Sequence, residues 1–382
     1  MLITNAHILT CAEKDYDNGY IYIEGKKIKS VGDMTDAPDD NCVIDVAGCV
    51  VCPGFIDAHT HLGLCHPSSK YEGMDLNENS DPVTPHIRTL DGIYQADECF
   101  DEALEAGVTT LMIGPGSANP IGGTFCTVKT VRGRIDDMAI QAESAMKMAF
   151  GENPKSTYGK GKSCSPVTRQ GTAAVIREAL FKAKEYMQAK DAGEKPSFNI
   201  KHEALIPVLR GEMTVKAHAH RSDDIFTALR IAREFGLKMS IEHCTEGHTV
   251  ADYLKEEKVP VTVGPVVGCR TKPELAKKSM KTAAELAEKG VCVALISDHP
   301  EIPSNLLPFY AALVAREGTG RDKALGMITI NAAKLIGMQN RLGSIESGKD
   351  ADLCILSGHP LDMESKMIMV IVDGKTQKDN RK

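Results

Sequence analysis

The chain has 382 residues, of which 42% are hydrophobic and 25% are charged, and its formal net charge is -7. This length accommodates one large domain and a small one, and the composition is that of an ordinary globular protein. An acidic balance without a basic cluster argues against a nucleic-acid partner. We expect no membrane span, because no run approaches about 20 apolar residues, and no signal peptide, because the N-terminus lacks a basic region.

The twelve cysteines are scattered along the chain. The one close spacing, Cys49-x-x-Cys52, lies in an apolar strand and has no second pair in the register of a zinc knuckle. Reduced cysteines that act as small hydrophobic residues fit this pattern better than disulfides do. We therefore expect a cytoplasmic protein.

Short β-rich segments separated by turn signals occupy residues 1–52. A long polar segment follows over residues 63–85, and loops of this length tend to be functional. From residue 95 onward strands and helices alternate, with long helices predicted over residues 168–190 and 223–235. Counted from Val50, eight strands are predicted, at residues 50–56, 107–113, 125–131, 144–150, 214–219, 238–242, 259–263 and 291–297.

Strands that alternate with helices favour a parallel sheet, and eight of them predict an α/β fold of the (β/α)8 TIM barrel type. After helices over residues 306–337, the chain returns to short strands near residues 351–356 and 367–372. We expect both chain ends to form one small β-sandwich domain, residues 1–52 plus 342–375. The barrel domain is predicted to cover residues 53–341.

Side chains that bind metals stand where the barrel strands are predicted to end. His59 and His61 are two residues apart in a strand and therefore point to one face. Neutral imidazole suits zinc, and active-site residues of such barrels lie at the C-terminal ends of strands. Four histidines and an aspartate exceed the needs of one tetrahedral zinc, so we expect two ions about a bridging hydroxide. The strand-end residues are His59, His61, Lys147, His218, His243 and Asp298.

The stretch Pro53-Gly54-Phe55-Ile56-Asp57-Ala58-His59-Thr60-His61 resembles the amidohydrolase superfamily. Ile241-Glu242-His243, Ser297-Asp298 and residues 342–353 resemble it too, so the similarity spans nearly the whole chain. Within the superfamily the chain is most similar to the imidazolonepropionase-related and prolidase-like group.

The resemblance implies roles for the strand-end residues. His59, His61 and Asp298 would bind the more buried metal, and His218 and His243 the more exposed one. Asp298 would also be the catalytic base and acid, taking a proton from the attacking water and passing it to the leaving amine.

Lys147 lies in a segment, Ala145-Met146-Lys147-Met148-Ala149-Phe150-Gly151, that resembles the strand on which many members carry a carboxylated lysine. Carboxylation would convert a cation, which zinc repels, into an anionic bridging ligand. The alternative is an ordinary lysine that reaches the barrel rim or pairs with an acid.

One departure from the superfamily bears on the reaction. One-metal deaminases and imidazolonepropionase itself place a glutamate three residues after the histidine of strand 5, and here Arg221 follows His218 at that spacing. This favours a two-metal hydrolase. Arg221 is a candidate for binding a substrate carboxylate, since guanidinium binds carboxylate bidentately; a surface arginine at a helix start is the alternative.

Three further side chains are candidates for substrate binding. His220 shares the strand face of His218, and His248 lies in the loop after His243. Asn119 lies in the loop of residues 114–123, whose glycines permit close backbone approach to a ligand; a plain connector is the alternative. The segment of residues 72–88 is predicted to cover the site, with a solvated surface loop as the alternative.

Taken together, these residues predict a zinc-dependent hydrolase of a C–N bond that uses a metal-activated hydroxide. The substrate would be a small amide, cyclic amide or dipeptide-like molecule, with two zinc ions per chain or, alternatively, one. A one-metal deaminase of an aminated heterocycle and a non-catalytic structural relative are the rival interpretations. Superfamily members often assemble into dimers or larger oligomers, so the resemblance is also compatible with a homo-oligomer.

Overall fold

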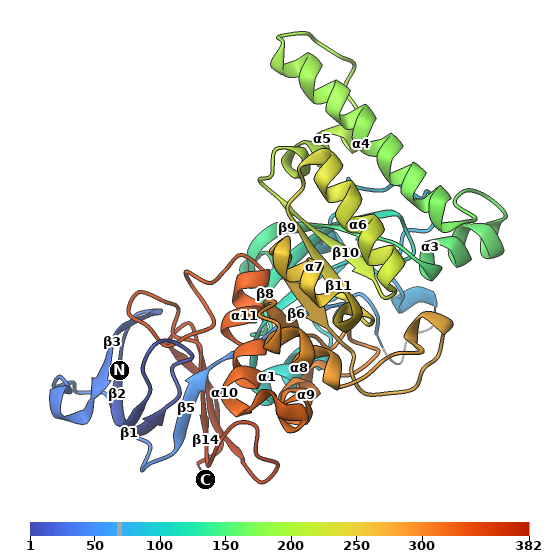
Figure 1. Cartoon of the computed structure of the whole chain (residues 1–382). Helices are drawn as coiled ribbons and strands as arrows, with labels where there is room; N and C mark the ends of the chain where they lie inside the picture. Colours follow the sequence, from blue (N-terminus) through green and yellow to red (C-terminus); the bar gives the residue numbers. More distant parts are fainter. Residues whose placement is uncertain (67–70, 382) are drawn as a thin grey trace.

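A computed structural model describes residues 1–66 and 71–381 and contains two β-sheets of eight strands each. Figure 1 shows the sheet built from both chain ends on one side of the barrel and helix α4 projecting on the other. The predicted fold class, a barrel with a small β structure from both chain ends, is confirmed. Among the described residues, no helix combines the length and apolarity needed to cross a membrane.

The small sheet joins the two ends of the chain, because β14 pairs antiparallel with β5. A hydrophobic cluster separate from that of the barrel, with Ile3, Ile21 and Ile371 among its members, covers it. The sheet continues past residue 375 with the edge strand β16. This strand was not predicted from the sequence, because its polar residues lack the apolar alternation that marks a strand. Its strands are β1 (Leu2–Ile8), β2 (Tyr16–Glu24), β3 (Lys27–Asp33), β4 (Val43–Asp45), β5 (Val50–Pro53), β14 (Leu353–Leu356), β15 (Met367–Val372) and β16 (Lys375–Asp379).

The barrel closes between its first and last strands. The backbone N–H of Asp298 donates to the carbonyl of His59 (3.2 Å), and that of His61 donates to the carbonyl of His299 (3.0 Å). Closure of the barrel therefore brings Asp298 beside the two histidines. The strands, in spatial order, are β6 (Phe55–Thr60), β7 (Val108–Ile113), β8 (Ile121–Lys129), β9 (Ala139–Ala149), β10 (Thr214–Ala219), β11 (Met239–His243), β12 (Val261–Val263) and β13 (Val293–Leu295).

One strand of the barrel differs from the parallel arrangement that we expected. β8 runs antiparallel to both β7 and β9. A parallel return needs a crossover of a dozen or more residues, whereas the β8–β9 connection holds only the short helix α2 (Ile135–Met138). As a result β8 begins, rather than ends, near the predicted site: a Cβ on Gly122 would lie 3.4 Å from Cγ of Lys147.

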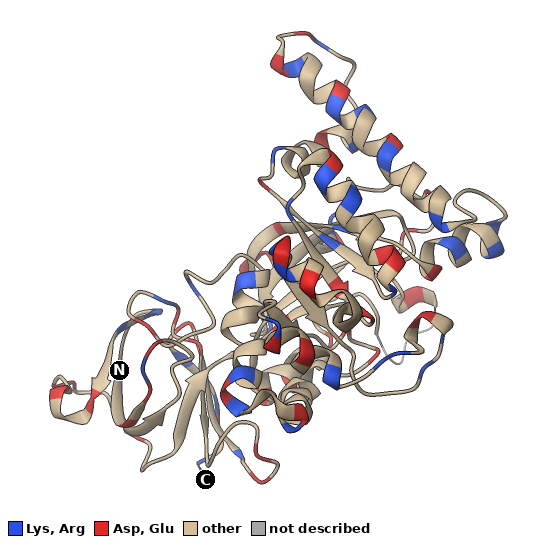
Figure 2. Cartoon of the chain, viewed as in Figure 1, with Lys and Arg blue, Asp and Glu red and all other residues tan. Residues whose placement is uncertain are grey.

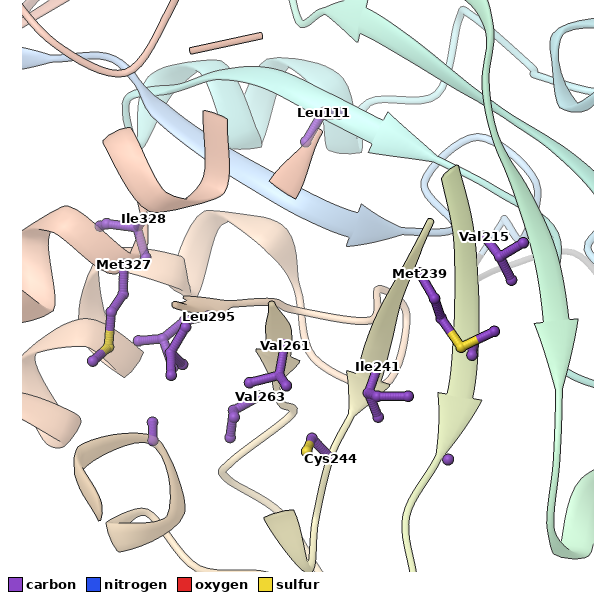
Figure 3. Packing of buried hydrophobic residues seen from close by; sticks show 14 of the residues in the cluster. Leu111, Val215, Met239, Ile241, Cys244, Val261, Val263, Leu295, Met327 and Ile328 are labelled. Atoms are coloured by element: carbon purple, nitrogen blue, oxygen red, sulfur yellow. The ribbon is translucent and has the colours of Figure 1, made fainter. Parts of the chain in front are cut away.

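Helices cover the outside of the barrel. Figure 3 shows side chains of the main hydrophobic cluster, including Ile241, Val261 and Leu295, between the barrel strands and the covering chain near Met327. Figure 2 shows charges of both signs along the projecting helix α4. The helices are α1 (Cys99–Glu105), α3 (Glu152–Lys155), α4 (Arg169–Asp191), α5 (Ile200–Leu209), α6 (Ser222–Phe235), α7 (Ala251–Glu256), α8 (Lys281–Glu288), α9 (Leu307–Val314), α10 (Arg321–Met327) and α11 (Ile330–Leu335).

Candidate metal centre

Two groups of side chains at the mouth of the barrel have the composition of metal sites. The inner group consists of His59, His61 and Asp298, and within it one ligand atom of each residue lies within 4.8 Å of the others. Oδ1 of Asp298 lies 3.2 Å from Nε2 of His61 and 3.7 Å from Nε2 of His59. The structure thus brings Asp298 beside two histidines that precede it by more than 200 positions in sequence.

The outer group consists of His218, His220 and Glu274, which meet the same 4.8 Å criterion. Oε1 of Glu274 lies 3.7 Å from Nε2 of His220 and 4.0 Å from Nε2 of His218. Glu274 was not predicted from the sequence, because it lies in the polar loop after β12 and not at a strand end. The available signal was its position: loops that follow barrel strands at this face commonly carry site residues.

His243 lies between the two groups. Its ring centroid is 4.5 Å from that of His218 and 5.2 Å from that of His59. Both His243 (φ 69°) and Asp298 (φ 54°) adopt the left-handed backbone conformation, which non-glycine residues rarely occupy. Such strain is concentrated at functional sites, so the backbone supports the view that these strand ends carry function.

Four of the five histidines have their Nδ1 atom fixed by the protein. Nδ1 of His59 donates to Glu242 Oε2 (2.7 Å), that of His61 to the Gly114 carbonyl (2.7 Å) and that of His243 to the Gly264 carbonyl (2.8 Å). Nδ1 of His220 hydrogen-bonds with the Thr245 hydroxyl (2.8 Å). Metal-binding histidines typically have this arrangement, which orients Nε2 toward the ion.

Gly264 allows one of these hydrogen bonds to form. Its φ is +149°, and a Cβ at this position would lie 2.3 Å from the carbonyl oxygen of Ile296. Only glycine therefore lets the end of β12 pass so close to the next strand while its own carbonyl accepts from His243.

The charge states of the side chains fit a divalent cation. Burial lowers the pKa of His59, His218, His220 and His243, so these rings are neutral at pH 7, as a metal ligand must be. Burial alone would raise the pKa of Asp298, but His243 and His61 outweigh it and hold that pKa below its usual range. The centre therefore offers neutral imidazoles beside an ionised carboxylate.

His218 provides the sharpest test of fit. It is buried, and neither ring nitrogen has a hydrogen-bond partner among the described residues. Leaving a buried polar atom unpaired costs about 1–3 kcal/mol. A metal ion can accept the lone pair of an imidazole nitrogen and so satisfy it, and the residues present therefore fit a metal of the zinc class.

Two buried lysines lie beneath the histidines. Nζ of Lys147 is 3.1 Å from Nε2 of His59, and burial lowers the pKa of Lys147 to about 8. Nζ of Lys216, which the sequence analysis did not single out, is 3.0 Å from Oε1 of Glu242. Because Glu242 also accepts from His59, Lys216 neutralises the carboxylate that orients a predicted ligand.

A cavity of about 420 Å³ opens over both groups. Its lining includes His61, His218 and Asp298, together with Asn77 and Lys272. Asn77 belongs to the polar segment that we expected to cover the site, and this part of the segment does border the cavity. Residues 67–70, which belong to the longer polar stretch of residues 63–85, lie outside the described residues.

Comparison with known proteins places the chain in a family. The model of the amidohydrolase family matches residues 50–377. The crystal structure of an amidohydrolase from Thermotoga maritima MSB8 is 41% identical, with a TM-score of 0.95 over 99% of both chains. The chain belongs to the amidohydrolase family. The enzyme is therefore a hydrolase that acts on C–N bonds, as the motif resemblance implied.

Other relatives of this amidohydrolase are more distant. The amidohydrolase tasK of Hapsidospora irregularis is 28% identical over 93% of this chain. The matched region covers 39% of the length of tasK. The imidazolonepropionase of Symbiobacterium thermophilum is 25% identical over 89% of this chain and 82% of its own length. The similarity to imidazolonepropionase agrees with the group suggested by the motifs.

The candidate substrate-binding residues differ in where they lie. His220 lines the cavity. Arg221 does not: its guanidinium is 44% exposed and pairs with Asp223 (2.8 Å) at the start of α6, as the alternative interpretation expected. His248 is half-buried outside the cavity lining, with Nδ1 3.4 Å from the Thr282 hydroxyl.

Asn119 is buried and serves the surrounding loops. Its side-chain amide donates to the carbonyls of Glu78 (2.7 Å) and Asp81 (3.2 Å), and its oxygen accepts from the Tyr158 hydroxyl (2.9 Å). These contacts pin the polar segment against the rim of the barrel. Asn119 thus shapes the wall of the site without lining the cavity.

Proposed function

We propose that this enzyme is a zinc-dependent amidohydrolase of small amide, cyclic amide or dipeptide-like substrates. The observation that carries the proposal is the convergence of the inner group with His218 and His243 on one cavity of about 420 Å³. We assign His59, His61 and Asp298 to an inner metal position. His218 and His243 are assigned to an outer one, and the soluble substrate would reach both through the cavity.

Each residue has a task in such a reaction. A divalent metal, when bound, supplies Lewis acidity that lowers the pKa of water and polarises the substrate carbonyl. The ionised Asp298, whose side chain is 15% exposed, can accept a proton from water as the water oxygen adds to the carbonyl carbon. The C–N bond then breaks as Asp298 delivers this proton to the leaving nitrogen. The Nδ1 hydrogen bonds keep the imidazole rings from rotating during turnover.

Lys147 is proposed to become carboxylated. Only a neutral amine adds to carbon dioxide, and a pKa of about 8 leaves roughly a tenth of the side chain neutral at pH 7. The product is an anion with the charge that a metal ligand needs, formed 3.1 Å from His59. Mass spectrometry of the intact protein, prepared with isotopically labelled bicarbonate, would detect the adduct, and Lys147→Met provides the control that lacks it.

A one-metal deaminase remains the second candidate, and one observation favours it. Arg221 occupies the position where deaminases carry glutamate. Glu274, however, brings a carboxylate close to His218 and His220 from another loop. The substrate would then be an aminated heterocycle. A non-catalytic role fits poorly, since it gives no reason for the histidine and carboxylate groups that face the cavity.

The test is a substrate screen with the purified enzyme and measured metal content. N-acyl amino acids, dipeptides, cyclic ureides and aminated heterocycles would be incubated separately, with products identified by mass. We expect addition of one water and release of an amine, lost on chelation and restored by zinc. Ammonia release with one metal per chain would instead establish the deaminase. A metal-free protein without hydrolytic activity would contradict both, and gel filtration would show whether it is an oligomer.

A further inference from the structure

Glu274 is a buried carboxylate with no task in the proposed reaction. It is 2% exposed, although it lies in a polar loop at the rim of the barrel. Oε2 accepts from the backbone N–H of Glu152 (3.0 Å), which anchors the side chain. Oε1 faces His218 and His220 and lies 2.8 Å from Nζ of Lys272. One carboxylate oxygen is thus fixed by the fold, and the other is directed at two imidazoles.

His220 is held in the same way as the histidines of the inner group. Its Nδ1 is fixed by Thr245 (2.8 Å), and its Nε2 lies 3.7 Å from Glu274. His218, also buried, has no hydrogen-bond partner for either ring nitrogen among the described residues. Two histidines and a glutamate form a ligand set that zinc enzymes use. His243, by contrast, belongs to neither of the three-residue groups within 4.8 Å.

We propose that His218, His220 and Glu274 form the outer metal site, with His220 and Glu274 taking the place that the proposed function gives to His243. The inference rests on the proposed function in one respect, the presence of a second ion. It places a ligand on the loop after β12, so the loop that borders the cavity also holds the metal.

Lys272 is the natural competitor of this ion. Its ammonium lies 2.8 Å from Oε1 of Glu274 and 2.9 Å from the side-chain oxygen of Asn153. A divalent cation at Glu274 must share that carboxylate with the lysine or displace it toward Asn153. Removing the ammonium should therefore strengthen metal binding, whereas a carboxylate that only anchors the loop would lose its partner and gain no metal affinity.

The test measures bound zinc, independently of activity. The full-length wild type and variants Glu274→Gln, His243→Gln, Lys272→Met and Glu301→Gln would be dialysed against buffered free zinc. Bound zinc per chain would be determined by elemental analysis, and the affinity of each equivalent by competition with a chromophoric chelator. Glu301 is the matched control, a carboxylate that lines the same cavity but belongs to neither group. Circular dichroism would confirm that each variant is folded.

We expect two equivalents in the wild type and in Glu301→Gln. In Glu274→Gln the affinity for the second zinc ion should fall by at least the roughly 10–100-fold that loss of an outer-shell partner costs. His243→Gln should change this affinity less. Lys272→Met should raise the affinity for the second zinc ion. If Glu274→Gln fails to fold, Lys272→Met decides, since an unchanged or weaker second equivalent there overturns the inference.

Two outcomes separate this inference from the proposed function. A second equivalent that survives Glu274→Gln but is lost in His243→Gln would overturn the inference and leave the proposed two-metal hydrolase standing. A wild type that binds one zinc only would overturn the inference as well. A wild type that binds none would contradict the proposed function itself.

Discussion

The inner and outer groups both pair two histidines with a carboxylate, but their carboxylates are held differently. Asp298 is placed by the closure of the barrel, through backbone hydrogen bonds between its strand and that of His59. Glu274 is placed by loop contacts, with Lys272 and with the backbone of Glu152. The inner group should therefore be as rigid as the barrel. The outer group can change with the loop, which is where substrate choice can vary within one fold.

The largest effect should follow from replacing Asp298 in the inner group. Asp298→Asn removes an ionised carboxylate that we assign to both metal binding and proton transfer. We expect kcat/KM to fall by about 10⁴-fold, the upper range for a general base, with less bound metal by elemental analysis. Glu301→Gln, which alters a carboxylate of the same cavity outside both groups, should retain the metal content of the wild type. Retention of a tenth of wild-type activity by Asp298→Asn would contradict its assignment.

Replacing Glu242 tests whether the inner group depends on the buried layer below it. Glu242→Gln leaves the ammonium of Lys216 buried without its charge partner, which should lower the free energy of unfolding by about 3–5 kcal/mol. It also replaces the carboxylate that accepts from His59 by a neutral amide, a weaker acceptor, so metal affinity should fall roughly 10–100-fold.

The double variant Glu242→Gln with Lys216→Met separates these two effects. Urea unfolding should show that most of the lost stability returns, because no uncompensated charge stays buried. Metal affinity should remain low, since His59 still lacks a carboxylate. Recovery of both properties together would show that Glu242 does not orient the ligand.

A pH-dependent effect should arise at the barrel closure. Burial raises the pKa of Asp57 to about 6 from its ordinary value of 3.8, although hydrogen bonds from Ser297 and from the Ser304 hydroxyl act in the opposite direction. Because the pKa of Asp57 is higher in the folded than in the unfolded protein, the protonated side chain stabilises the folded state. This contribution to the free energy of unfolding is complete below pH 3.8 and is lost as the pH rises through 6. The full change is about 3 kcal/mol.

Asp57→Asn should remove this dependence. In chelator-containing buffer, the difference in unfolding free energy between wild type and variant should shift in favour of the variant from pH 4 to pH 7. A difference that does not change over this range would show that Asp57 titrates normally.

The smallest effect is expected at Arg221, which flanks the outer group. Its exposed ion pair with Asp223 should contribute no more than about 0.2–1 kcal/mol to stability. Arg221→Ala should therefore leave KM and kcat within about twofold of wild type, because surface substitutions usually change the free energy of unfolding by less than about 0.5 kcal/mol. A tenfold rise in KM alone would restore its predicted role in substrate binding.

The sequence was most informative where regular structure determines position. Apolar strands that end in His59, His61, His218, His243 and Asp298 could be recognised from pattern alone, and the structure brings these side chains to one face of the barrel. Eight strands were counted correctly for the same reason. Nothing in the strand pattern reports direction, however, so the antiparallel course of β8 was missed.

Loop residues and buried charges were harder to predict. Glu274 and Lys272 form an ordinary polar sequence, and only the folded loop directs the carboxylate at His220. Lys216 could not be recognised as part of the site, because its role depends on an ion pair with Glu242 on the neighbouring strand. That pairing is set by the register of β10 and β11. Asn119 and Arg221 were chosen for chemistry without knowledge of direction, and their side chains point away from the cavity to partners of their own.

Anomalous diffraction at the zinc edge, from crystals of the zinc-loaded enzyme, would locate the metal ions. We expect a peak about 2.0–2.2 Å from Nε2 of His59, Nε2 of His61 and a carboxylate oxygen of Asp298. A second peak is predicted beside His218. A fully loaded crystal with no peak at the inner group would show that His59, His61 and Asp298 do not bind the metal.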